Sequence, residues 1–338
     1  MSLKSRHGHP LFCIERRRIP GSRGASKDFM ATQATNSSPR NSKHGTPGQI
    51  DAARSGVFNL GAGNNKLTIN RLGFGAMRIT GEGIWGEPKN PEEARKVLRR
   101  AVELGVNFID TADAYGPEVS ERLIAEALHP YAKDLLIATK GGLTRSGPNK
   151  WAPVGRKEYL RQCVEMSLRR LKVERIGLWQ LHRIDTQVPV EESLGEIKKM
   201  QQEGKILHVG LSEVKPAEIE QARKIVDIVS VQNQYNIGDR QHEDTVDYCE
   251  QHQLGFIPWF PVGGGKLTKP GGPLDSAAKR HGVTITQLAI AWLLHRSPVI
   301  LPIPGTSSVQ HLEENIASAG IQLSDSEWTE LEAEVKKA

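Results

Sequence analysis

The chain has 338 residues, a formal net charge of +6 and three cysteines. This length fits one large domain or two small ones, and α/β barrels of about 250 residues fold as one domain. Cys13, Cys163 and Cys249 have no CxxC spacing, which argues against a zinc ribbon or a disulfide framework. Free thiols indicate a reducing compartment and therefore a cytoplasmic protein. No apolar run approaches the roughly 18 residues of a membrane span, so no membrane partner is expected.

The positive charge is concentrated in residues 1–56, which hold ten Lys or Arg residues and only three acidic ones. The remainder is almost neutral, so the folded part needs no nucleic-acid partner. Residues 1–56 are rich in Ser, Arg, Gly and Pro and show little apolar periodicity, which predicts a disordered extension. Its role stays open between a nonfunctional extension, a start at Met30, a transit peptide and a polybasic docking arm.

The predicted folded domain covers residues 57–338 and opens with a short β-hairpin. Residues 58–60 and 66–69 flank the glycine- and asparagine-rich stretch 61–65, which is a turn signal between two strand patterns. The glycines of this turn lack the third glycine of a dinucleotide fingerprint and do not precede a helix. A Rossmann dinucleotide-binding fold is therefore not predicted here.

Strand and helix patterns then alternate eight times along the chain. The predicted strands are residues 71–77, 107–112, 135–140, 176–181, 207–212, 228–232, 256–261 and 299–303. The predicted helices are residues 91–104, 119–128, 156–172, 190–203, 216–225, 240–253, segments within 274–294, 309–319 and 326–337. This α/β pattern predicts a (β/α)8 TIM barrel whose lower end is plugged by the hairpin. An open, doubly wound sheet is the alternative.

Chemically active side chains end three consecutive strands of this pattern. Asp110 is followed by Tyr115, the next strand ends in Lys140, and the next in His182. Strand ends of this kind face the active site of a barrel. Lys140 would lower the pKa of Tyr115, Asp110 would keep Lys140 charged, and a neutral His182 would orient a substrate oxygen. Each residue alone has an ordinary structural explanation, but together they favour general acid catalysis of carbonyl reduction.

Residues 108–116, Phe-Ile-Asp-Thr-Ala-Asp-Ala-Tyr-Gly, resemble a signature of the aldo-keto reductase superfamily, and the likeness extends over about residues 58–335. The resemblance implies a barrel with NADPH as a dissociable cosubstrate, NADH being the alternative, and no metal. It matches Asp110, Tyr115, Lys140 and His182 to the catalytic tetrad. Hydride would pass to a carbonyl carbon of a small-molecule substrate while Tyr115 protonates the oxygen.

The resemblance also implies cofactor contacts. They are Gly75, Ala76 and Met77 beside the nicotinamide; Ser212 and Gln232 at its carboxamide; Trp259 stacked on its ring; Phe260, Pro261, Val262 and Gly263 over the pyrophosphate; and Gly305, Thr306, Ser307, His311, Glu314 and Asn315 around the adenosine phosphate. Three positions depart from the family pattern. Glu213 replaces an Asn of many members, and Gly305 and His311 replace a Lys and an Arg that hold the 2′-phosphate in some. The Gly-Thr-Ser-Ser form of 305–308 still favours NADPH.

Residues 231–236, 259–264 and 303–315 resemble a bacterial branch of pyridoxal-reductase-like proteins. This resemblance favours a small aromatic or heteroaromatic aldehyde such as pyridoxal, with Trp85 and Trp151 as candidates to line its pocket. The chain has no Tyr-x-x-x-Lys, Gly-x-Ser-x-Gly or zincin motif. The alternative function is an NADPH-binding regulatory barrel, similar to channel-associated members, with the basic extension as docking arm. A monomer or weak homo-oligomer is expected.

Overall fold

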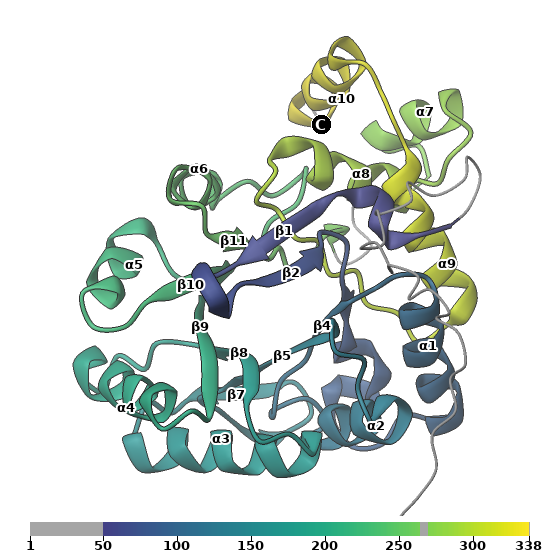
Figure 1. Cartoon of the computed structure of the whole chain (residues 1–338). Coiled ribbons are helices and arrows are strands. Elements are labelled where there is room, and N and C mark those ends of the chain that lie inside the picture. Colours follow the sequence, from purple (N-terminus) through teal and green to yellow (C-terminus); the bar gives the residue numbers. More distant parts are fainter. Residues whose placement is uncertain (1–49, 264–269, 338) are drawn as a thin grey trace, which may run out of the picture. The chain divides into compact units, whose positions relative to one another are not determined.

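The structure, a computed structural model, describes residues 50–263 and 270–337 (Figure 1). The disorder predicted for the extension concerns mainly residues 1–49, which lie outside the described residues. Within the described part, no helix is long and apolar enough to cross a lipid bilayer.

Ordered structure begins before the predicted boundary at residue 57. Ala52–Ser55 form a 3-10 helix, η1, in which Ala52 and Ser55 are buried. Asp51 caps this helix, because its Oδ1 accepts a hydrogen bond of 2.9 Å from the backbone N–H of Ala53. The prediction that the extension reaches residue 56 is therefore wrong for residues 52–55, since two of their four side chains are already buried.

Parallel strands form the centre of the fold in the order β11-β10-β9-β8-β5-β4-β3, a seven-stranded sheet within the described residues. Their bounds are β3 Phe74–Gly75, β4 Phe108–Asp110, β5 Leu136–Gly141, β8 Ile176–Leu181, β9 Ile206–Ser212, β10 Ile228–Gln232 and β11 Gly255–Phe256. Residues 299–303, predicted as the eighth strand, close the ring. The Leu301 N–H donates to Phe256 O at 2.8 Å, and the Gly73 N–H donates to Pro302 O at 2.9 Å. The sheet is therefore a curled α/β barrel and not an open, doubly wound sheet.

Residues 107–112 yield only the three residues of β4. Three other predicted strands are also shorter than expected, and all three lie beside the closure of the barrel. Residues 71–77 yield only the two residues of β3, because the chain turns into the 3-10 helix η3 (Ala76–Ile79). Residues 256–261 yield only the end of β11, since Pro258 and Pro261 have no N–H to donate. Residues 299–303 are reduced to one isolated bridge, between Phe256 and Ile300.

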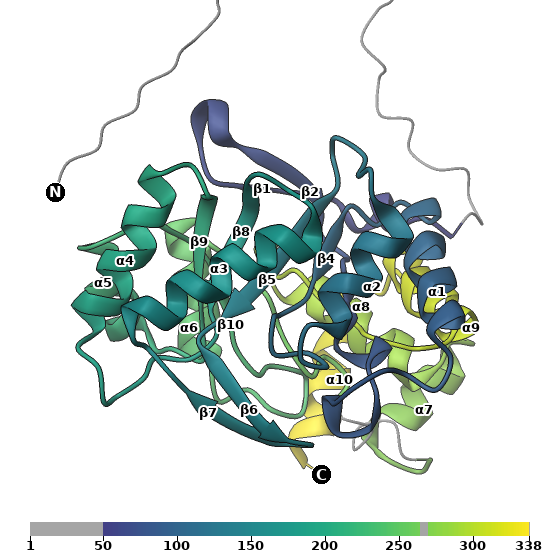
Figure 2. The same cartoon turned by 90° about the horizontal axis from the view of Figure 1, so that it is seen from below.

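Helices cover the outside of the barrel, and Figure 2 shows several of them packed side by side around it. They are α1 Pro91–Glu103, α2 Val119–Leu128, α3 Lys157–Leu171, α4 Val190–Gln202, α5 Pro216–Arg223, α6 Glu243–His252, α7 Pro273–Arg280, α8 Ile285–Arg296, α9 Val309–Ala317 and α10 Asp325–Lys337. In α1, Ala94, Val97, Leu98 and Ala101 are buried, which is the spacing of one helix face. Asn90 caps α1 by accepting from the Glu93 N–H at 3.1 Å. The predicted helices are confirmed with boundaries shifted by a few residues.

The predicted hairpin is confirmed as β1 (Val57–Leu60) paired with β2 (Leu67–Asn70). Its side chains meet the starts of three barrel strands. Leu67 packs beside Gly177 of β8, Leu60 packs beside Gly255 of β11, and Asn65 O lies 2.7 Å from Nε2 of His208 in β9. The hairpin therefore covers the N-terminal end of the barrel.

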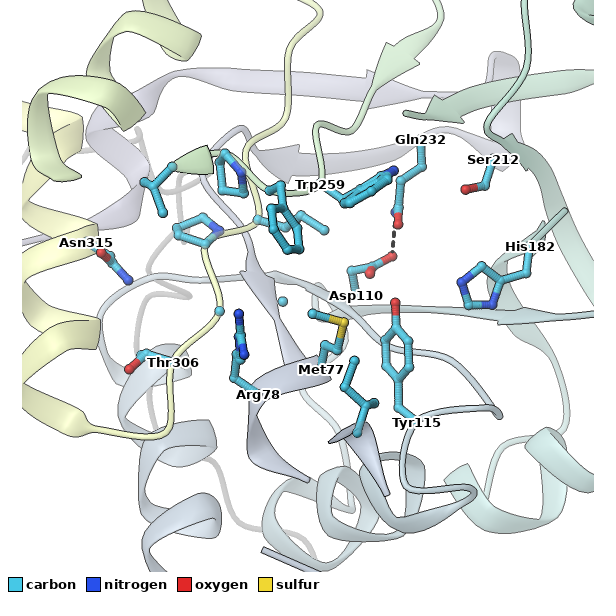
Figure 3. Close-up of a pocket in the computed structure, with 18 of the residues that line it drawn as sticks. Met77, Arg78, Asp110, Tyr115, His182, Ser212, Gln232, Trp259, Thr306 and Asn315 are labelled. Atoms are coloured by element: carbon cyan, nitrogen blue, oxygen red, sulfur yellow. Dashed lines mark hydrogen bonds between the residues drawn. The ribbon is translucent and has the colours of Figure 1, made fainter. Parts of the chain in front are cut away.

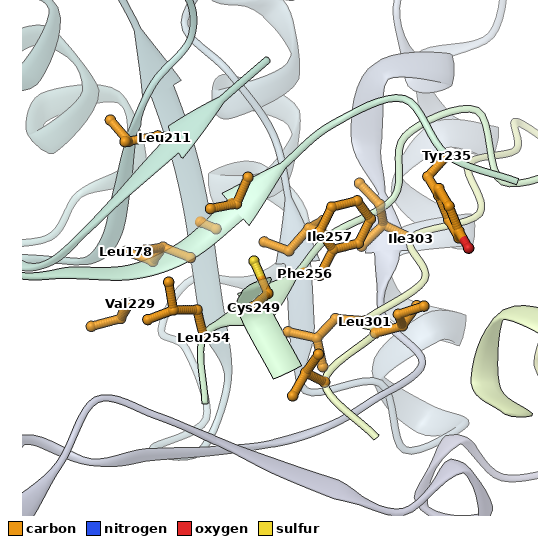
Figure 4. Packing of buried hydrophobic residues seen from close by; sticks show 14 of the residues in the cluster. Leu178, Leu211, Val229, Tyr235, Cys249, Leu254, Phe256, Ile257, Leu301 and Ile303 are labelled. Carbon is orange, nitrogen blue, oxygen red and sulfur yellow. The ribbon is translucent and has the colours of Figure 1, made fainter. Parts of the chain in front are cut away.

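Buried side chains from the strands converge in a core shown in Figure 4. Leu178 of β8, Leu211 of β9, Phe256 of β11 and Leu301 are each 1% exposed or less. Because the strands contribute to one cluster, their relative positions are fixed by packing as well as by backbone hydrogen bonds. A second, unpredicted hairpin of β6 (Leu143–Gly147) and β7 (Lys150–Pro153) follows β5.

Candidate active site

A cavity of about 940 Å³ opens at the C-terminal ends of the strands (Figure 3). This volume is at the upper end of the range for small-molecule and cofactor sites. The predicted site residues that line it are Gly75, Met77, Asp110, Tyr115, His182, Ser212, Gln232, Trp259, Phe260, Pro261, Val262, Gly305, Thr306, His311, Glu314 and Asn315. Most of the predicted site residues therefore lie around one cavity.

Four of the predicted site residues do not line this cavity in the part of the chain that the structure describes. Lys140 is 0% exposed and lies behind Asp110 and Tyr115. The Ala76 side chain is also 0% exposed and packs into the hydrophobic core. Ser307 is exposed, and Gly263 adjoins the segment that the structure does not describe. The Ala76 side chain therefore belongs to the core and not to the cavity wall.

Asp110, Lys140 and Tyr115 form one connected buried group. Lys140 Nζ donates to Asp110 Oδ2 at 2.6 Å and to the Thr111 carbonyl at 2.8 Å. The same ammonium lies 3.4 Å from the Tyr115 hydroxyl oxygen. Asp110 is 2% exposed and Tyr115 is 7% exposed. Asp110 thus provides the counter-charge that a buried ammonium requires. Both Asp110 and the phenol of Tyr115 line the cavity, whereas Lys140 does not.

The second oxygen of Asp110 is held by two glutamines. Gln180 Nε2 and Gln232 Nε2 donate to Asp110 Oδ1 at 3.1 and 2.9 Å, the latter drawn as the dashed line in Figure 3. Gln232 was expected at the nicotinamide carboxamide, and here its amide N–H contacts the aspartate. Gln180 was not predicted. A buried amide two residues before His182 in an otherwise apolar strand was the available signal, since alternate strand residues share a face.

Burial changes the expected acid–base behaviour of Tyr115. Burial raises the pKa of Tyr115 above its ordinary value, and the Lys140 charge only partly opposes this shift. Lys140 does act to lower the pKa of Tyr115, as predicted, but the sequence did not reveal that burial outweighs this effect and makes the net shift upward. For Lys140, burial acts to lower the pKa, but the charges of Asp110 and Tyr115 more than compensate and raise it. Tyr115 is a phenol and Lys140 an ammonium at neutral pH.

His182 ends β8 beside this group. Its ring lies edge-on to the Tyr115 ring, with the two centroids 5.9 Å apart. Burial, followed by the positive charges of Lys140, Arg183 and Arg145, holds the pKa of His182 well below its ordinary value. The imidazole is therefore uncharged at neutral pH, as predicted, and suited to a hydrogen bond with a neutral carbonyl oxygen.

Arg145 organises the rim of the cavity. Its guanidinium lies 3.6 Å from the centre of the Trp151 ring and 5.5 Å from that of Trp85. Its Nη1 donates to the carbonyls of Ile84 and Ala114, both at 2.7 Å. Trp151 lines the cavity, whereas Trp85 is not among the described lining residues. Arg145 thus joins the loop of Ile84, the hairpin carrying Trp151 and the loop before Tyr115.

Glu213, which replaces an Asn of many family members, anchors Trp259. Glu213 Oε1 accepts from Trp259 Nε1 at 2.6 Å and from the Gln234 backbone N–H at 2.8 Å. The Glu213 backbone has φ of +57°, a conformation in which asparagine is more common. The carboxylate therefore fixes the indole whose face lines the cavity.

Two glycines form a flat part of the wall. A Cβ at Gly305 would lie 2.5 Å from the Gly75 carbonyl oxygen, and one at Gly75 would lie 2.6 Å from the Ile303 carbonyl oxygen. Neither position tolerates a side chain, because such approaches are far below van der Waals contact. This contact gives a physical reason for glycine at 305, where other members carry lysine.

Arg78 supplies a cation that the sequence analysis missed. It lines the cavity next to Gly305 and, in Figure 3, extends between Met77 and Thr306. No hydrogen bond or ion pair joins Arg78 to another residue in the described part of the chain. Thr306 nearby precedes the N-terminus of α9, where backbone N–H groups favour an anion. An aromatic face, a flat backbone floor, a guanidinium and a helix N-terminus together fit a dinucleotide with phosphate groups.

Comparison with known proteins places these features in a family. The model of the aldo/keto reductase family matches residues 71–336. An uncharacterized oxidoreductase of Schizosaccharomyces pombe is 52% identical over 295 residues, covering 87% of this chain and 95% of the relative. Pyridoxine 4-dehydrogenase of Escherichia coli is 42% identical over 277 residues, covering 80% and 95%.

Among solved structures, a glycerol dehydrogenase from Gluconobacter oxydans superimposes with a TM-score of 0.76 at 26% identity, covering 84% of this chain and 96% of that one. The predicted family and the predicted enzyme class are therefore confirmed. This chain belongs to the aldo/keto reductase family and is an NAD(P)H-dependent oxidoreductase.

Proposed function

We propose that the protein reduces small aromatic or heteroaromatic aldehydes, pyridoxal among them, to the alcohols, with NADPH as reductant and Tyr115 as general acid. The observation that carries this proposal is the position of the Tyr115 hydroxyl, at the cavity wall and 3.4 Å from the buried Lys140 ammonium. No observation of the site favours a purely regulatory barrel.

Each member of the tetrad has a separate role. His182 hydrogen-bonds the carbonyl oxygen and orients it toward the Tyr115 hydroxyl. Bound NADPH would supply the hydride to the carbonyl carbon. Tyr115 donates its phenolic proton as negative charge develops on the oxygen. The Lys140 ammonium stabilises the phenolate that remains, and Asp110, which accepts from Lys140 at 2.6 Å, keeps that ammonium charged.

The cavity supports a flat, apolar substrate. Ile84, Leu143, Trp151 and Pro153 line it beside Tyr115 and His182, and the Trp151 ring centre lies 6.3 Å from the Tyr115 ring centre. Aromatic rings pack well against such a wall. The relative named pyridoxine 4-dehydrogenase acts on a heteroaromatic alcohol, and the same residues would serve its oxidation in the reverse direction. These points support an aromatic or heteroaromatic aldehyde.

The wall opposite Tyr115 supports the choice of NADPH. Arg78, which has no carboxylate partner in the described residues, and the α9 N-terminus both favour phosphate groups. Trp259, held by Glu213, offers a flat face for the nicotinamide. His311, Glu314 and Asn315 line the same side and are the residues that we propose beside the adenosine.

The experiment is NADPH oxidation across a panel of pyridoxal, benzaldehyde and a short aliphatic aldehyde, with NADH in parallel. The proposal predicts turnover with both aromatic compounds, a kcat/KM for the aliphatic aldehyde at least about tenfold lower, and slower turnover with NADH. A full chain that binds NADPH but reduces no aldehyde would contradict the enzyme proposal. Removing residues 1–49 should leave kcat/KM unchanged, because the tetrad lies entirely within the described domain.

A further inference from the structure

We propose that Arg183 binds an ionised acidic substituent of the substrate, so that the site prefers aldehydes that carry a carboxylate or a phenolate. This inference rests on the proposed function, because it concerns the substrate of the same site. It extends that function by naming a second chemical group on the substrate and the side chain that recognises it. The sequence analysis did not single out Arg183.

Arg183 is fixed at the substrate side of the cavity. It directly follows His182 at the end of β8, and both residues line the cavity wall. Its Nη1 donates to the His182 carbonyl at 2.5 Å and to Ser212 Oγ at 2.9 Å. Ser212 is 1% exposed, so these two contacts hold the guanidinium in place against the strand ends.

No carboxylate of the described residues pairs directly with this guanidinium, and the Glu213 charge acts on it only from beyond ion-pair distance. Among the described residues, no carboxylate oxygen lies within 4.0 Å of its nitrogens, and its Nε and Nη2 donate to no acceptor. A partly buried cation whose hydrogen-bond partners are neutral is unfavourable, and burial lowers the pKa of Arg183 although the charge of Glu213 partly opposes this shift. An anionic group on a ligand would remove this penalty and use the remaining N–H donors.

Other arginines of intermediate exposure show what a structural role looks like in this fold. Arg170 pairs with Glu121 at 2.6 Å, and Arg161 pairs with Glu196 at 2.5 Å. Arg71 has no carboxylate, but it donates from both Nε and Nη2 to three backbone carbonyls. Arg183 differs from these three residues because only one of its nitrogens is engaged and because it faces the cavity.

The cofactor does not account for this charge. In Figure 3, His182 and Ser212 lie on one side of Tyr115, and Arg78 and Thr306 lie on the other. The phosphate-binding features are on the side of Arg78, away from Arg183. Ser212 is expected beside the nicotinamide carboxamide, which is a neutral group. An anion next to Arg183 therefore has to come from the substrate.

Paired aldehydes that differ in charge and by one methyl group test this inference. The 2-, 3- and 4-carboxybenzaldehydes are compared with their methyl esters, and salicylaldehyde with 2-methoxybenzaldehyde, for wild type, Arg183→Gln and Arg183→Lys. Arg175→Gln is the matched control, because Arg175 is exposed and precedes the other end of the same strand. NADPH binding is measured for each variant by fluorescence quenching, which also reports a folded site.

In the wild type, we expect the kcat/KM of at least one carboxylated aldehyde or of salicylaldehyde to exceed that of its neutral partner about tenfold. Arg183→Gln should remove this preference by lowering kcat/KM for the acid about 10- to 100-fold, with less than about threefold change for the ester and for NADPH affinity. Arg183→Lys should restore part of the preference, and Arg175→Gln should keep all of it.

Two results would overturn the inference. One is a wild type that reduces every ester at least as well as its acid, a measurement that needs no variant. The other is an Arg183→Gln enzyme that loses the same factor on acids and esters, which would make Arg183 a packing or cofactor residue. A wild type that reduces neither kind of aldehyde would instead contradict the proposed function. Whether the carboxylates or the phenolate carry the preference identifies the acidic group.

Discussion

The two sides of the barrel are built differently. One side, here called the long-strand arc, consists of β4, β5, β8, β9 and β10, which contain three to seven residues each. The other, the short-strand arc, consists of β3, β11 and residues 299–303, in which the strands have two residues or none. Asp110, Lys140 and His182 come from the long-strand arc, whereas Gly75, Trp259 and Gly305 come from the short-strand arc.

This difference corresponds to two kinds of task. Side chains at the ends of long, doubly paired strands are held in place before the reaction, which proton transfer requires. The short-strand arc offers mainly backbone, as at Gly75 and Gly305, and side chains on loops, as at Trp259. Such a surface suits a cosubstrate that binds and leaves in each cycle. Substitutions in the two arcs should therefore change different kinetic constants.

Lys140→Met in the long-strand arc should lower kcat by about 10²- to 10⁴-fold, because Tyr115 loses the ammonium that stabilises its phenolate. NADPH affinity should change less than about threefold, since Lys140 lies behind the cavity wall. The unpaired Asp110 should also cost roughly 3–5 kcal/mol of unfolding free energy. The Lys140→Met/Asp110→Asn double variant separates the loss of stability from the loss of kcat. It should regain unfolding free energy, because no unpaired carboxylate remains, but its kcat should stay low. A single variant within tenfold of wild-type kcat would refute this role.

Arg78→Gln in the short-strand arc should raise the Kd for NADPH about tenfold, because a charge-assisted contact with phosphate is lost. The value of kcat at saturating NADPH should stay within about twofold. The dependence of the Kd on salt concentration should also become weaker. Arg175→Gln again provides the matched loss of one charge. An unchanged Kd would show that the charge of Arg78 does not contribute to cofactor binding.

Glu213 connects the arcs, since it follows β9 and anchors Trp259. Glu213→Ala should weaken NADPH binding about three- to fivefold by freeing the indole, with a smaller effect on kcat. Glu213→Gln keeps an acceptor oxygen for Trp259 Nε1 and should retain most of the affinity. Isothermal titration with NADPH measures both variants. Equal losses in Gln and Ala variants would point to the charge, and not to the hydrogen bond to Trp259.

Asp113 should affect stability with little change in activity. Burial and the nearby Glu121 charge raise the pKa of Asp113 to about 7. Between about pH 4 and pH 7 the native state thus binds more protons than the unfolded state, so stability falls as the pH rises through this window. Asp113→Asn should remove roughly 2–4 kcal/mol of this pH dependence. Urea unfolding at pH 5 and pH 8 measures it, and a wild-type slope in the variant would contradict the assignment.

Sequence patterns located the long-strand arc better than the short-strand arc. Each buried apolar run there predicted a strand. The single polar side chain at its end, Asp110, Lys140 or His182, predicted a residue of the site. The short strands were overpredicted, since the patterns at 71–77 and 256–261 do not reveal the start of η3 or that Pro258 and Pro261 leave only isolated pairing beyond β11. Arg78 and Arg183 were missed, because a single polar residue beside a strand end looks like an ordinary surface group until the fold brings the walls together. Gln180 was missed although its place inside an apolar strand was a signal.

The most direct test of the central claim is single-turnover NADPH oxidation by the Tyr115→Phe variant with the cofactor already bound. Phenylalanine keeps the ring beside His182 and Trp151 but removes the proton that the carbonyl oxygen receives. We predict a hydride-transfer rate at least about 10²- to 10⁴-fold below that of the wild type, with the Kd for NADPH within about twofold. A rate within tenfold of the wild type, at unchanged NADPH affinity, would show that another group supplies the proton.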